Sequence, residues 1–301
     1  MKKIIAIAGA TGNLGGKIVS ALLAKGAEVR AIVRLETDIK KITELEKKGV
    51  KVFRVNTSIQ SEISKHCIGA NCVVSAVAGL RETIIDAQKV FLDGAVEAKV
   101  KRFIPSDYSI DFTNLEEGQN RNLDLRREFH TYLDKSPIKA TTIFNGAFMD
   151  LLTTDMPLIL FNQKRILCWG NRDQILEFTT TDDVAEFTAE AALDNDSPRY
   201  LRIAGDRLSC HDFVKSLTEI TSKKYKLFRP GRIGLLNSMI KLTRFFSPSK
   251  NELYPAWQGM QYMRDMMEGR ILFQKYDNQR YPNLKWTSVK EFLMKEGVSL
   301  K

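Results

Sequence analysis

The chain has 301 residues, 44% of them hydrophobic and 27% charged, which is typical of a soluble globular protein with one large domain or two closely joined ones. No apolar run approaches the roughly 18 residues of a membrane-spanning helix, and the lysines and arginines behind the net charge of +10 occur along the whole length, so membrane and nucleic-acid partners are disfavoured. Neither a secretory cleavage site nor a Cys-x-x-Cys pair is present, which favours a cytoplasmic location with buried thiols and argues against disulfides or a metal site.

The chain opens on an apolar run, residues 4–8, that predicts a buried parallel strand. Leu14, Ile18 and Leu22, at four-residue spacing, predict the helix after it. Between them, the glycine turn of residues 9–15 points the free N–H groups of the helix start outward, an arrangement that binds phosphate. Its glycines are spaced by three and three, so we interpret it as a variant of the dinucleotide fingerprint, with a purely structural tight turn as the alternative.

A second strand is expected over residues 28–33, and Arg34 follows it. In dinucleotide folds an acidic residue at this place binds the ribose 2′-hydroxyl, whereas a basic residue pairs with a 2′-phosphate. Arg34 therefore favours NADP. Glu36 and Asp38 would serve NAD if the strand ended later, and an ordinary surface arginine is a further interpretation.

The rest of the first half alternates between strands and helices with short connections, which predicts an α/β fold with a doubly wound parallel sheet. Ala76, Ala78 and Gly79 leave room at the end of the fourth strand, where ligands bind in open α/β sheets. The further strands are expected at residues 50–55, 72–78, 100–104 and 138–144, and the helices between them at 37–48, 82–98 and up to about 135.

Beyond residue 150 the alternation ends. We expect a hairpin of residues 165–169 and 175–179, and Thr181 as the N-cap of the following helix. The last part is mostly helical. We therefore predict a dinucleotide-binding domain over 1–150 and a smaller substrate region over 151–301, of which about 175–205 packs back on the first domain. Helices are expected at residues 209–222, 231–246, 255–269 and 288–296.

Two of these helices carry apolar faces that allow two interpretations each. The face of the helix over 255–269 would receive a flat aromatic ligand or pack in the core. The basic and apolar helix over 232–246 would pack on the core, which we favour, or lie on a membrane surface. The first face consists of Tyr254, Trp257, Met260, Met263 and Met267; the second combines Ile233, Leu236, Ile240 and Phe245 with Arg232, Lys241 and Arg244.

Several segments together resemble a known family. They are Gly-Ala-Thr-Gly-Asn-Leu-Gly-Gly at 9–16, Val-Arg at 33–34, Lys-Val-Lys-Arg-Phe-Ile-Pro-Ser-Asp at 99–107, Arg-Arg at 126–127 and Asn-Gly-Ala-Phe-Met at 145–149. The chain resembles the NmrA-like, isoflavone-reductase-like branch of the atypical short-chain dehydrogenase/reductase family. The resemblance implies an NADP-preferring Rossmann domain and hydride transfer to a small aromatic or quinone-like molecule.

The resemblance also implies which positions hold the cofactor. The glycine turn would cradle the pyrophosphate and Arg34 the 2′-phosphate, while later positions would lie along the dinucleotide. The predicted cofactor-binding residues are Gly9, Thr11, Gly12, Asn13, Leu14, Gly15, Arg34, Ala76, Val77, Ser106, Phe144, Asn145, Gly146 and Ala147.

The chain departs from the family in its acid/base residues. Reductases of the isoflavone type place a lysine shortly before the paired arginines 126–127, and none is present here. The Tyr-x-x-x-Lys pair of ordinary short-chain dehydrogenases is also missing. Tyr108, if a nearby cation lowers its pKa, and His130, on the helix that contributes to the family's active site, are the candidate proton donors, with packing and structural roles as alternatives.

These departures leave more than one function open. We favour an NAD(P)H-dependent oxidoreductase that acts on a small aromatic or quinone-like substrate, as a monomer or homodimer. A non-catalytic NADP(H)-binding redox sensor that acts through a protein partner is the alternative. A sugar-nucleotide epimerase is less favoured because such enzymes need the tyrosine base.

Overall fold

The computed structural model describes residues 2–154 and 156–298. The chain divides into two compact units: unit 1 comprises Met1–Tyr108, Leu125–Ile143 and Val184–Leu201, and unit 2 comprises Ser109–Asp124, Phe144–Asp183 and Arg202–Lys301. Each unit is therefore assembled from separate stretches of sequence. The two-domain division at residue 150 stays a prediction.

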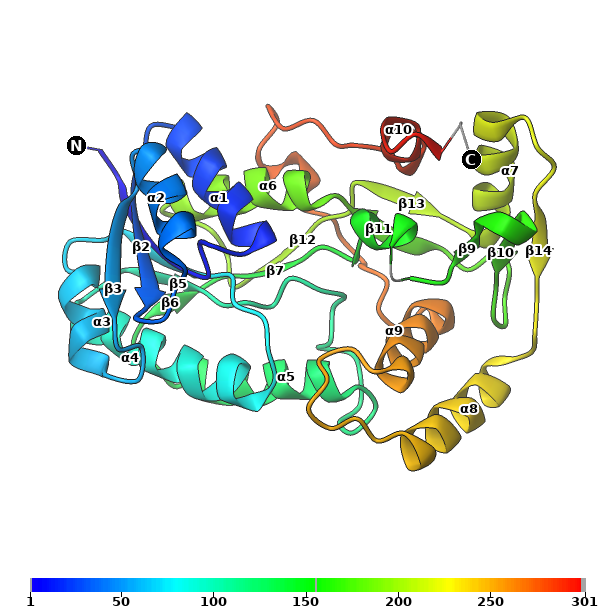
Figure 1. Ribbon diagram of the computed structural model, residues 1–301, viewed down its shortest axis with the longest axis horizontal. Coiled ribbons are helices and arrows are strands. Elements are labelled where there is room, and N and C mark those ends of the chain that lie inside the picture. Colours follow the sequence, from blue (N-terminus) through cyan, green and yellow to red (C-terminus); the bar gives the residue numbers. More distant parts are fainter. Residues whose placement is uncertain (1, 155, 299–301) are drawn as a thin grey trace. The chain divides into compact units, whose positions relative to one another are not determined.

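Unit 1 is built on a parallel sheet (Figure 1). Among the described residues this sheet has six strands, in the order β3-β2-β1-β4-β5-β6. This order is that of a doubly wound Rossmann sheet, so the predicted fold class is confirmed. The strands are β1 Ile4–Ala8, β2 Glu28–Arg34, β3 Lys51–Val55, β4 Cys72–Ser75, β5 Arg102–Ile104 and β6 Lys139–Ala140.

Helices cover both faces of this sheet, which is why the central strand β1 is apolar throughout (Figure 1). Ile5 and Ile7 on one face of β1 and Ala6 and Ala8 on the other are all almost fully buried. The helices that contribute to unit 1 are α1 Asn13–Ala24, α2 Ile39–Lys47, α3 Gln60–Cys67, α4 Gln88–Glu97, the greater part of α5 Arg121–Leu133, and α6 Thr181–Leu193 from Val184 on.

Two helices of unit 1 differ from the prediction. Helix α3 is not predicted, because its short sequence is mostly polar and only Ile63, Ser64 and Cys67 are buried. The helix expected over 82–98 begins instead as a π-helical turn, η1 Glu82–Ala87, before α4. Single π-helical turns are frequent at functional sites.

The strand expected over residues 138–144 is split in two. Its first part, β6, joins the main sheet, whereas β7 Thr142–Phe144 pairs with β12 Tyr200–Arg202. The hydrogen bonds run from Thr142 N to Arg199 O in unit 1, at 2.8 Å, and from Ile203 N to Phe144 O in unit 2, at 2.9 Å. The strand thus changes its partner at residue 141.

Unit 2 combines two small sheets with the helices that the sequence predicts for the C-terminal part of the chain. The sheets have the orders β14-β10-β9 and β13-β11-β8. The strands are β8 Ala147–Phe148, β9 Ile159–Leu160, β10 Arg165–Leu167, β11 Leu176–Thr179, β13 Asp206–Leu208 and β14 Lys226–Phe228. The helices are α7 Cys210–Thr221, α8 Ile233–Phe246, α9 Ala256–Glu268 and α10 Val289–Lys295, with 3₁₀ turns η2 Met149–Thr153, η3 Phe161–Gln163 and η4 Asn278–Arg280.

The predicted hairpin of residues 165–169 and 175–179 is wrong. Strand β10 pairs with β9 and β14, and β11 pairs with β8 and β13. The N–H of Cys168 extends the ladder with β14 by donating to Phe228 O at 2.9 Å, so that edge of β10 is already taken. The predicted N-cap also moves by one residue, because the Thr180 hydroxyl, not that of Thr181, accepts from Asp183 N at 3.0 Å.

Candidate cofactor site

The glycine turn of unit 1 joins β1 to α1. Gly9 has a φ of 82°, a left-handed conformation that favours glycine, and its carbonyl accepts from Gly12 N at 3.0 Å. Gly12 is the N-cap of α1, and none of the described side chains forms a capping bond there. Helix α1 begins at Asn13, followed by Leu14. Its first N–H groups are therefore not capped by a side chain and suit a phosphate group.

Close packing explains why this turn needs glycine. A Cβ at Gly15 would lie 2.0 Å from the carbonyl oxygen of Gly9, and a Cβ at Gly9 would lie 2.4 Å from the carbonyl oxygen of Ala76. The turn thus packs backbone to backbone against the end of β4. The sheet order reverses between β1 and β4, and this switch point is where open α/β sheets bind their ligands. Thr11 lies in the same turn.

A second arginine accompanies Arg34. Arg34 is exposed at the end of β2, and the guanidinium of Arg54, from β3, donates a hydrogen bond to the carbonyl of the next residue, Leu35. Sequence reasoning misses Arg54 because only the strand register brings it here. The Asp38 carboxylate, the alternative partner for NAD, instead caps α2 by accepting from Lys40 N at 2.8 Å. Two guanidinium groups at this edge suit a 2′-phosphate.

Ser106 connects the ends of two strands next to the glycine turn. Its hydroxyl donates to the carbonyl of Val77 at 2.6 Å, and its N–H donates to Oε1 of Gln88 at 2.9 Å. Gln88 is fully buried at the start of α4. Sequence reasoning misses it, although a glutamine on the buried side of an apolar helix is a usable signal. Val77 and Ser106 therefore lie together beyond the ends of β4 and β5, and their contact with a cofactor stays a prediction.

Tyr108, the first candidate proton donor, is buried. Burial, reinforced by the negative charge of Asp107, raises the pKa of its phenol. This direction is opposite to the lowering by a nearby cation that the catalytic interpretation assumes. The phenol therefore stays protonated at neutral pH, and its role as a proton donor remains a prediction.

His130, the second candidate, lies on α5 in a buried polar network of unit 1. Its Nε2 is 2.6 Å from Oδ2 of Asp107, and its Nδ1 is 3.2 Å from Nη2 of Arg199. The Thr142 hydroxyl also donates to Asp107 Oδ2, at 2.8 Å. Burial pushes the pKa of Asp107 up, but the neighbouring His130 lowers it overall. These contacts fasten α5 to the end of β5, which supports a structural role, and the catalytic role stays a prediction.

The remaining predicted cofactor residues lie in unit 2, where Phe144 ends β7 and Ala147 begins β8. Asn145 between them is fully buried. Its N–H donates to Ser109 O at 3.0 Å, and its carbonyl accepts from the Thr179 hydroxyl at 2.7 Å. Its side-chain oxygen has no hydrogen-bond partner within the described residues, so it can accept one from a ligand.

Gly146 has a φ of 65°, and a Cβ there would lie 2.4 Å from the carbonyl oxygen of Glu177 on β11. Glu177 itself is a buried carboxyl group that sequence reasoning misses, since its strand shows no signal for an inward glutamate. Its Oε1 accepts from Phe273 N at 3.2 Å and from the Tyr276 hydroxyl. Burial raises the pKa of Glu177. A buried carboxyl group with a raised pKa therefore lies against the predicted cofactor segment of unit 2.

The apolar face of α9 belongs mainly to the core. Trp257, Met263 and Met267 are at most 6% exposed, whereas Tyr254, before the helix, is 65% exposed. The core interpretation is therefore the better one for this face, and Met260 is half-buried.

Helix α9 also buries polar residues that sequence reasoning misses. Asn120, just before α5, donates from Nδ2 to Asp265 Oδ2 at 2.8 Å and accepts from Gln258 Nε2 at 2.8 Å. Arg264 donates from Nε to the other oxygen of Asp265, at 2.8 Å. Burial raises the pKa of Asp265 to about 6. The segment in which the family's lysine is missing thus begins in a buried amide and carboxyl cluster.

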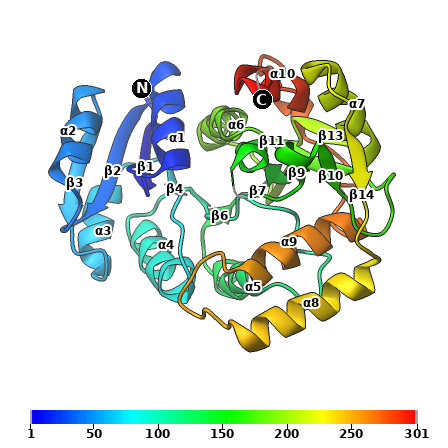
Figure 2. The ribbon, with the colours of Figure 1, turned by 45° about the vertical axis from the view of Figure 1, so that its right-hand side comes forward.

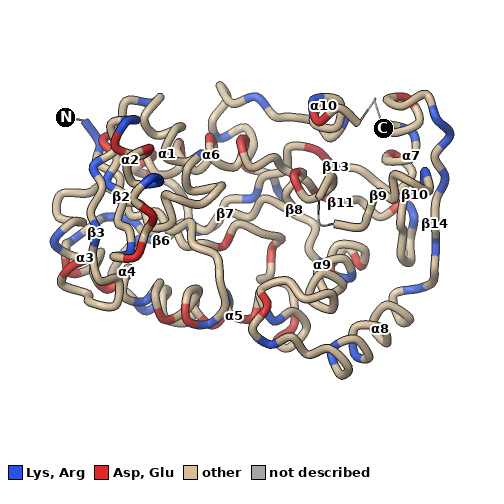
Figure 3. Tube along the Cα trace, viewed as in Figure 1, with Lys and Arg blue, Asp and Glu red and all other residues tan. Residues whose placement is uncertain are grey.

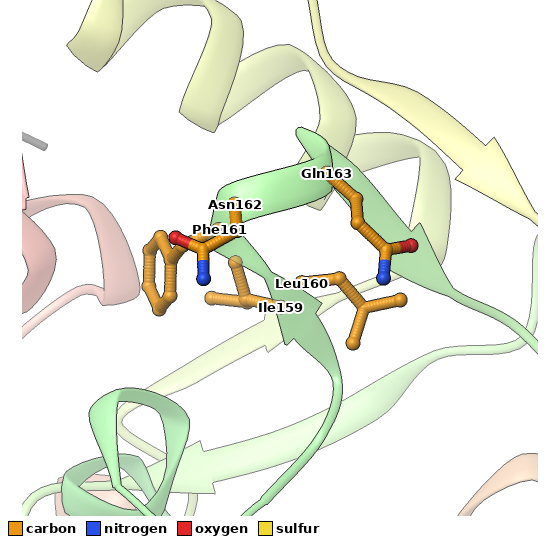
Figure 4. A pocket seen from close by; sticks show the side chains of 5 residues that line it. All are labelled: Ile159, Leu160, Phe161, Asn162 and Gln163. Atoms are coloured by element: carbon orange, nitrogen blue, oxygen red, sulfur yellow. The ribbon is translucent and has the colours of Figure 1, made fainter.

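A hollow of about 460 Å³ lies on unit 2 (Figure 4). The five side chains that line it come from one short segment of β9 and η3 and include two amides and no titratable group. A substrate site needs polar groups that converge from several elements, so this hollow is a poor candidate for one. The lining residues are Ile159, Leu160, Phe161, Asn162 and Gln163.

Residues 2–154 and 156–298 contain neither a candidate metal cluster nor a helix that could span a membrane. No group of three or more His, Cys, Asp or Glu side chains in these ranges could hold a metal ion. No helix in the same ranges has the length and apolar composition to cross a membrane.

The sheet order and the switch-point glycine turn define unit 1 as an α/β fold of the Rossmann type. The chain belongs to the NmrA-like family, whose model matches residues 1–257, so the resemblance is confirmed. It is 30% identical over 243 residues to Oxidoreductase BOA1 of Botryotinia fuckeliana, with 76% of this chain and 79% of that protein covered.

Solved structures share the fold over nearly the whole chain. AtPrR2 with NADP+ and (+)pinoresinol has a TM-score of 0.78 at 20% identity, with 97% of this chain and 98% of that chain covered. The NADPH-dependent quinone oxidoreductase QOR2 from Escherichia coli, complexed with NADPH, has a TM-score of 0.77 at 16% identity, with 97% and 99% covered.

Proposed function

We propose that this chain is an NADPH-dependent oxidoreductase that transfers a hydride to a small aromatic or quinone-like substrate. The observation that carries the proposal is the uncapped glycine turn at the switch point, with Arg34 and Arg54 at the neighbouring sheet edge. The names of similar proteins support it, since they include an oxidoreductase, a reductase with NADP+ and pinoresinol, and a quinone oxidoreductase with NADPH.

In this proposal the glycine turn holds the pyrophosphate, and Arg34 and Arg54 hold the 2′-phosphate. The bound cofactor would supply the hydride. General acid catalysis contributes about 10²- to 10⁴-fold to rates, and the chain lacks the family's lysine. An easily reduced acceptor such as a quinone depends least on general acid catalysis. The proposed proton donors are Tyr108 and, as the second choice, His130. We also propose a cytoplasmic location and a monomer or homodimer.

The second candidate function is a redox sensor that binds NADP(H) without turnover and acts through a protein partner. Two observations favour it. Residues 120–127 contain no lysine, and His130, which lies a few residues later, is engaged by Asp107 at 2.6 Å.

The deciding experiment measures NADPH oxidation by absorbance with a panel of quinones, enones and enol-ethers. We expect at least one acceptor to be reduced above the protein-free rate, and Tyr108→Phe to lower kcat by about 10²-fold. Tyr132→Phe is the matched control, because it removes a hydroxyl that binds Asp93 on α4, at 2.7 Å, and is expected to leave kcat unchanged.

NADPH binding, followed by its fluorescence, separates the outcomes. Binding without turnover on any acceptor would favour the sensor over the enzyme. Absence of binding by a folded protein would reject both functions. Turnover that Tyr108→Phe leaves unchanged would keep the enzyme and remove Tyr108 as its proton donor.

A further inference from the structure

Helix α8 exposes an apolar stripe. The helix lies alongside α9 (Figure 2), and Leu236 and Ile240, which are 1% and 5% exposed, provide its buried contacts. Four other apolar residues recur at steps of four, three and four, which aligns them on one helix face. They are Leu235, Met239, Leu242 and Phe246, which are 49%, 36%, 59% and 74% exposed.

Phe245, next to this stripe, is 79% exposed, so the prediction that it faces the core is wrong. With Phe246 it places two aromatic rings in solvent, with centroids 5.2 Å apart. Single exposed apolar residues need no explanation, but a continuous row of them along a helix marks an interaction surface.

The chain around this stripe is strongly basic. Residues 220–251 contain eight lysines and arginines and no acidic residue. This stretch therefore carries most of the net charge of +10 of the whole chain. The trace through β14 into α8 accordingly shows blue and no red (Figure 3). Seven of the eight side chains are exposed, and within the described part of the chain none of the seven forms an ion pair with a carboxylate. These seven are Lys224, Lys226, Arg229, Arg232, Lys241, Arg244 and Lys250.

The combination of charge and apolar surface selects among possible partners. A second copy of this chain would bring the same positive charge to the interface and repel it. A nucleic acid offers phosphates but no apolar phase for the stripe. An anionic bilayer offers both, since its headgroups attract basic residues and its acyl boundary receives the apolar face of a helix.

We propose that α8 and the basic stretch 220–251 dock this protein peripherally on an anionic lipid bilayer. The stripe lies at the boundary between headgroups and acyl chains, with the rings of Phe245 and Phe246 at interfacial depth. The basic side chains contact the headgroups. This surface shares no residue with the predicted cofactor site, and the proposal replaces the expectation that the protein has no membrane partner.

Flotation of the full-length protein with vesicles tests the proposal. We expect binding to vesicles of phosphatidylcholine with about one third phosphatidylserine, and at least about tenfold weaker partition to phosphatidylcholine alone. Raising the salt from about 0.1 M to about 1 M should weaken binding because the Debye length shortens from about 10 Å to about 3 Å.

Two sets of variants separate the two components of binding. The double variant L242E/F246E should lower partition at least about tenfold, because it puts charge into the stripe. The matched control Met294→Glu changes another exposed apolar residue of unit 2, 55% exposed on α10, and should bind as the wild type does. The pair K241E/K250E should lower binding to anionic vesicles, whereas K40E/K41E on α2 should not.

Far-ultraviolet circular dichroism and NADPH fluorescence confirm that each variant is folded. Wild-type protein that stays unbound with anionic vesicles would overturn the proposal. Equal partition of L242E/F246E and Met294→Glu would overturn the role of the stripe. A dimer of the wild type that L242E/F246E dissociates, without vesicle binding, would assign the surface to a second copy instead.

Discussion

At the scale of single residues, Arg34 and Arg54 come from neighbouring strands, and we propose that both bind the 2′-phosphate. Arg34 ends β2, and Arg54 comes from β3 and binds the carbonyl that follows Arg34. Guanidinium groups bind phosphate in a forked geometry, with two hydrogen bonds each. In the proposed site, a nucleotide with a 2′-phosphate would gain from both groups, and a nucleotide with a 2′-hydroxyl would gain little.

We therefore expect Arg34→Ala to weaken NADPH binding by about 10- to 100-fold, and NADH binding by less than about threefold, as loss of a charge-assisted hydrogen bond implies. Titrations followed by nucleotide fluorescence give both affinities. Lys47→Ala, which removes an exposed cation at the end of α2, is the control and should leave both unchanged. Equal losses for the two nucleotides would remove the preference for NADP.

Some of these positions can be predicted from the residue type, and others cannot. Gly9 and Gly15 are predictable because only glycine fits where a Cβ would meet a carbonyl oxygen at 2.4 and 2.0 Å. Arg54 and Gln88 are not predictable from the sequence. Each bonds to a residue of a different segment, and the sequence of one strand or helix does not show which segment will lie beside it.

At the scale of elements, α9 shows a limit of periodicity. Its apolar residues predict a buried face, but Gln258 and Asp265 are also buried, with hydrogen bonds to Asn120 and Arg264. Polar residues in a helix interface depend on hydrogen-bond partners elsewhere in the chain. The apolar periodicity of the helix alone therefore predicts that they are exposed to solvent. Likewise, β10 and β11 look like a hairpin from their spacing and take other partners in the sheets.

The pKa of Asp265, raised by burial from 3.8 to about 6, makes the stability of α9 packing depend on pH. The pKa of this carboxyl group is higher in the folded state than in the unfolded state. Its contribution to stability is therefore complete at a pH below the unfolded-state pKa and is lost as the pH rises through the folded-state pKa. The contribution is therefore lost between about pH 4 and pH 6, and it amounts to about 3 kcal/mol.

The side chain introduced by Asp265→Asn cannot ionise. We therefore expect the free energy of unfolding of the variant, relative to that of the wild type, to be higher at about pH 7 than at about pH 4, by up to about 3 kcal/mol. The side-chain amides of Asn120 and Gln258 can turn over to accept the new donor, because Oε1 of Gln258 has no partner among the described residues. Urea unfolding at both pH values measures the difference.

The exposed carboxyl of Asp173 provides the control, since its side chain is 70% accessible. Asp173→Asn should follow the pH profile of the wild type. Parallel profiles of Asp265→Asn and the wild type would show that Asp265 titrates normally and that the cluster does not hold its proton.

At the scale of the whole molecule, unit 1 depends on residues far apart in the sequence. The apolar side of α6 is completely buried at Val184, Phe187 and Ala191. The guanidinium of Arg102 also donates to the carbonyls of Asp194 and Asn195, at 3.2 and 2.8 Å. The alternation of strands and helices predicts the sheet, but a local pattern cannot show that its core is completed by residues 184–201.

This dependence predicts the behaviour of fragments. A fragment of residues 1–150 lacks α6, so we expect it to lose cooperative thermal unfolding, because several fully buried apolar side chains, each contributing roughly 1.5–3 kcal/mol, are missing. The matched fragment 1–205 contains every segment of unit 1 and is expected to unfold in a single transition. Circular dichroism measures both, and cooperative unfolding of 1–150 would support the domain boundary at residue 150.

The same interleaving has a consequence for synthesis on the ribosome. The chain passes out of unit 1 after Tyr108 and does not deliver the last residue of that unit until Leu201. At about 5–20 residues per second, the first five strands wait roughly five to twenty seconds for the segment that closes their core. During that interval the nascent chain carries an uncovered apolar surface, and this is the stage at which it would depend most on a chaperone.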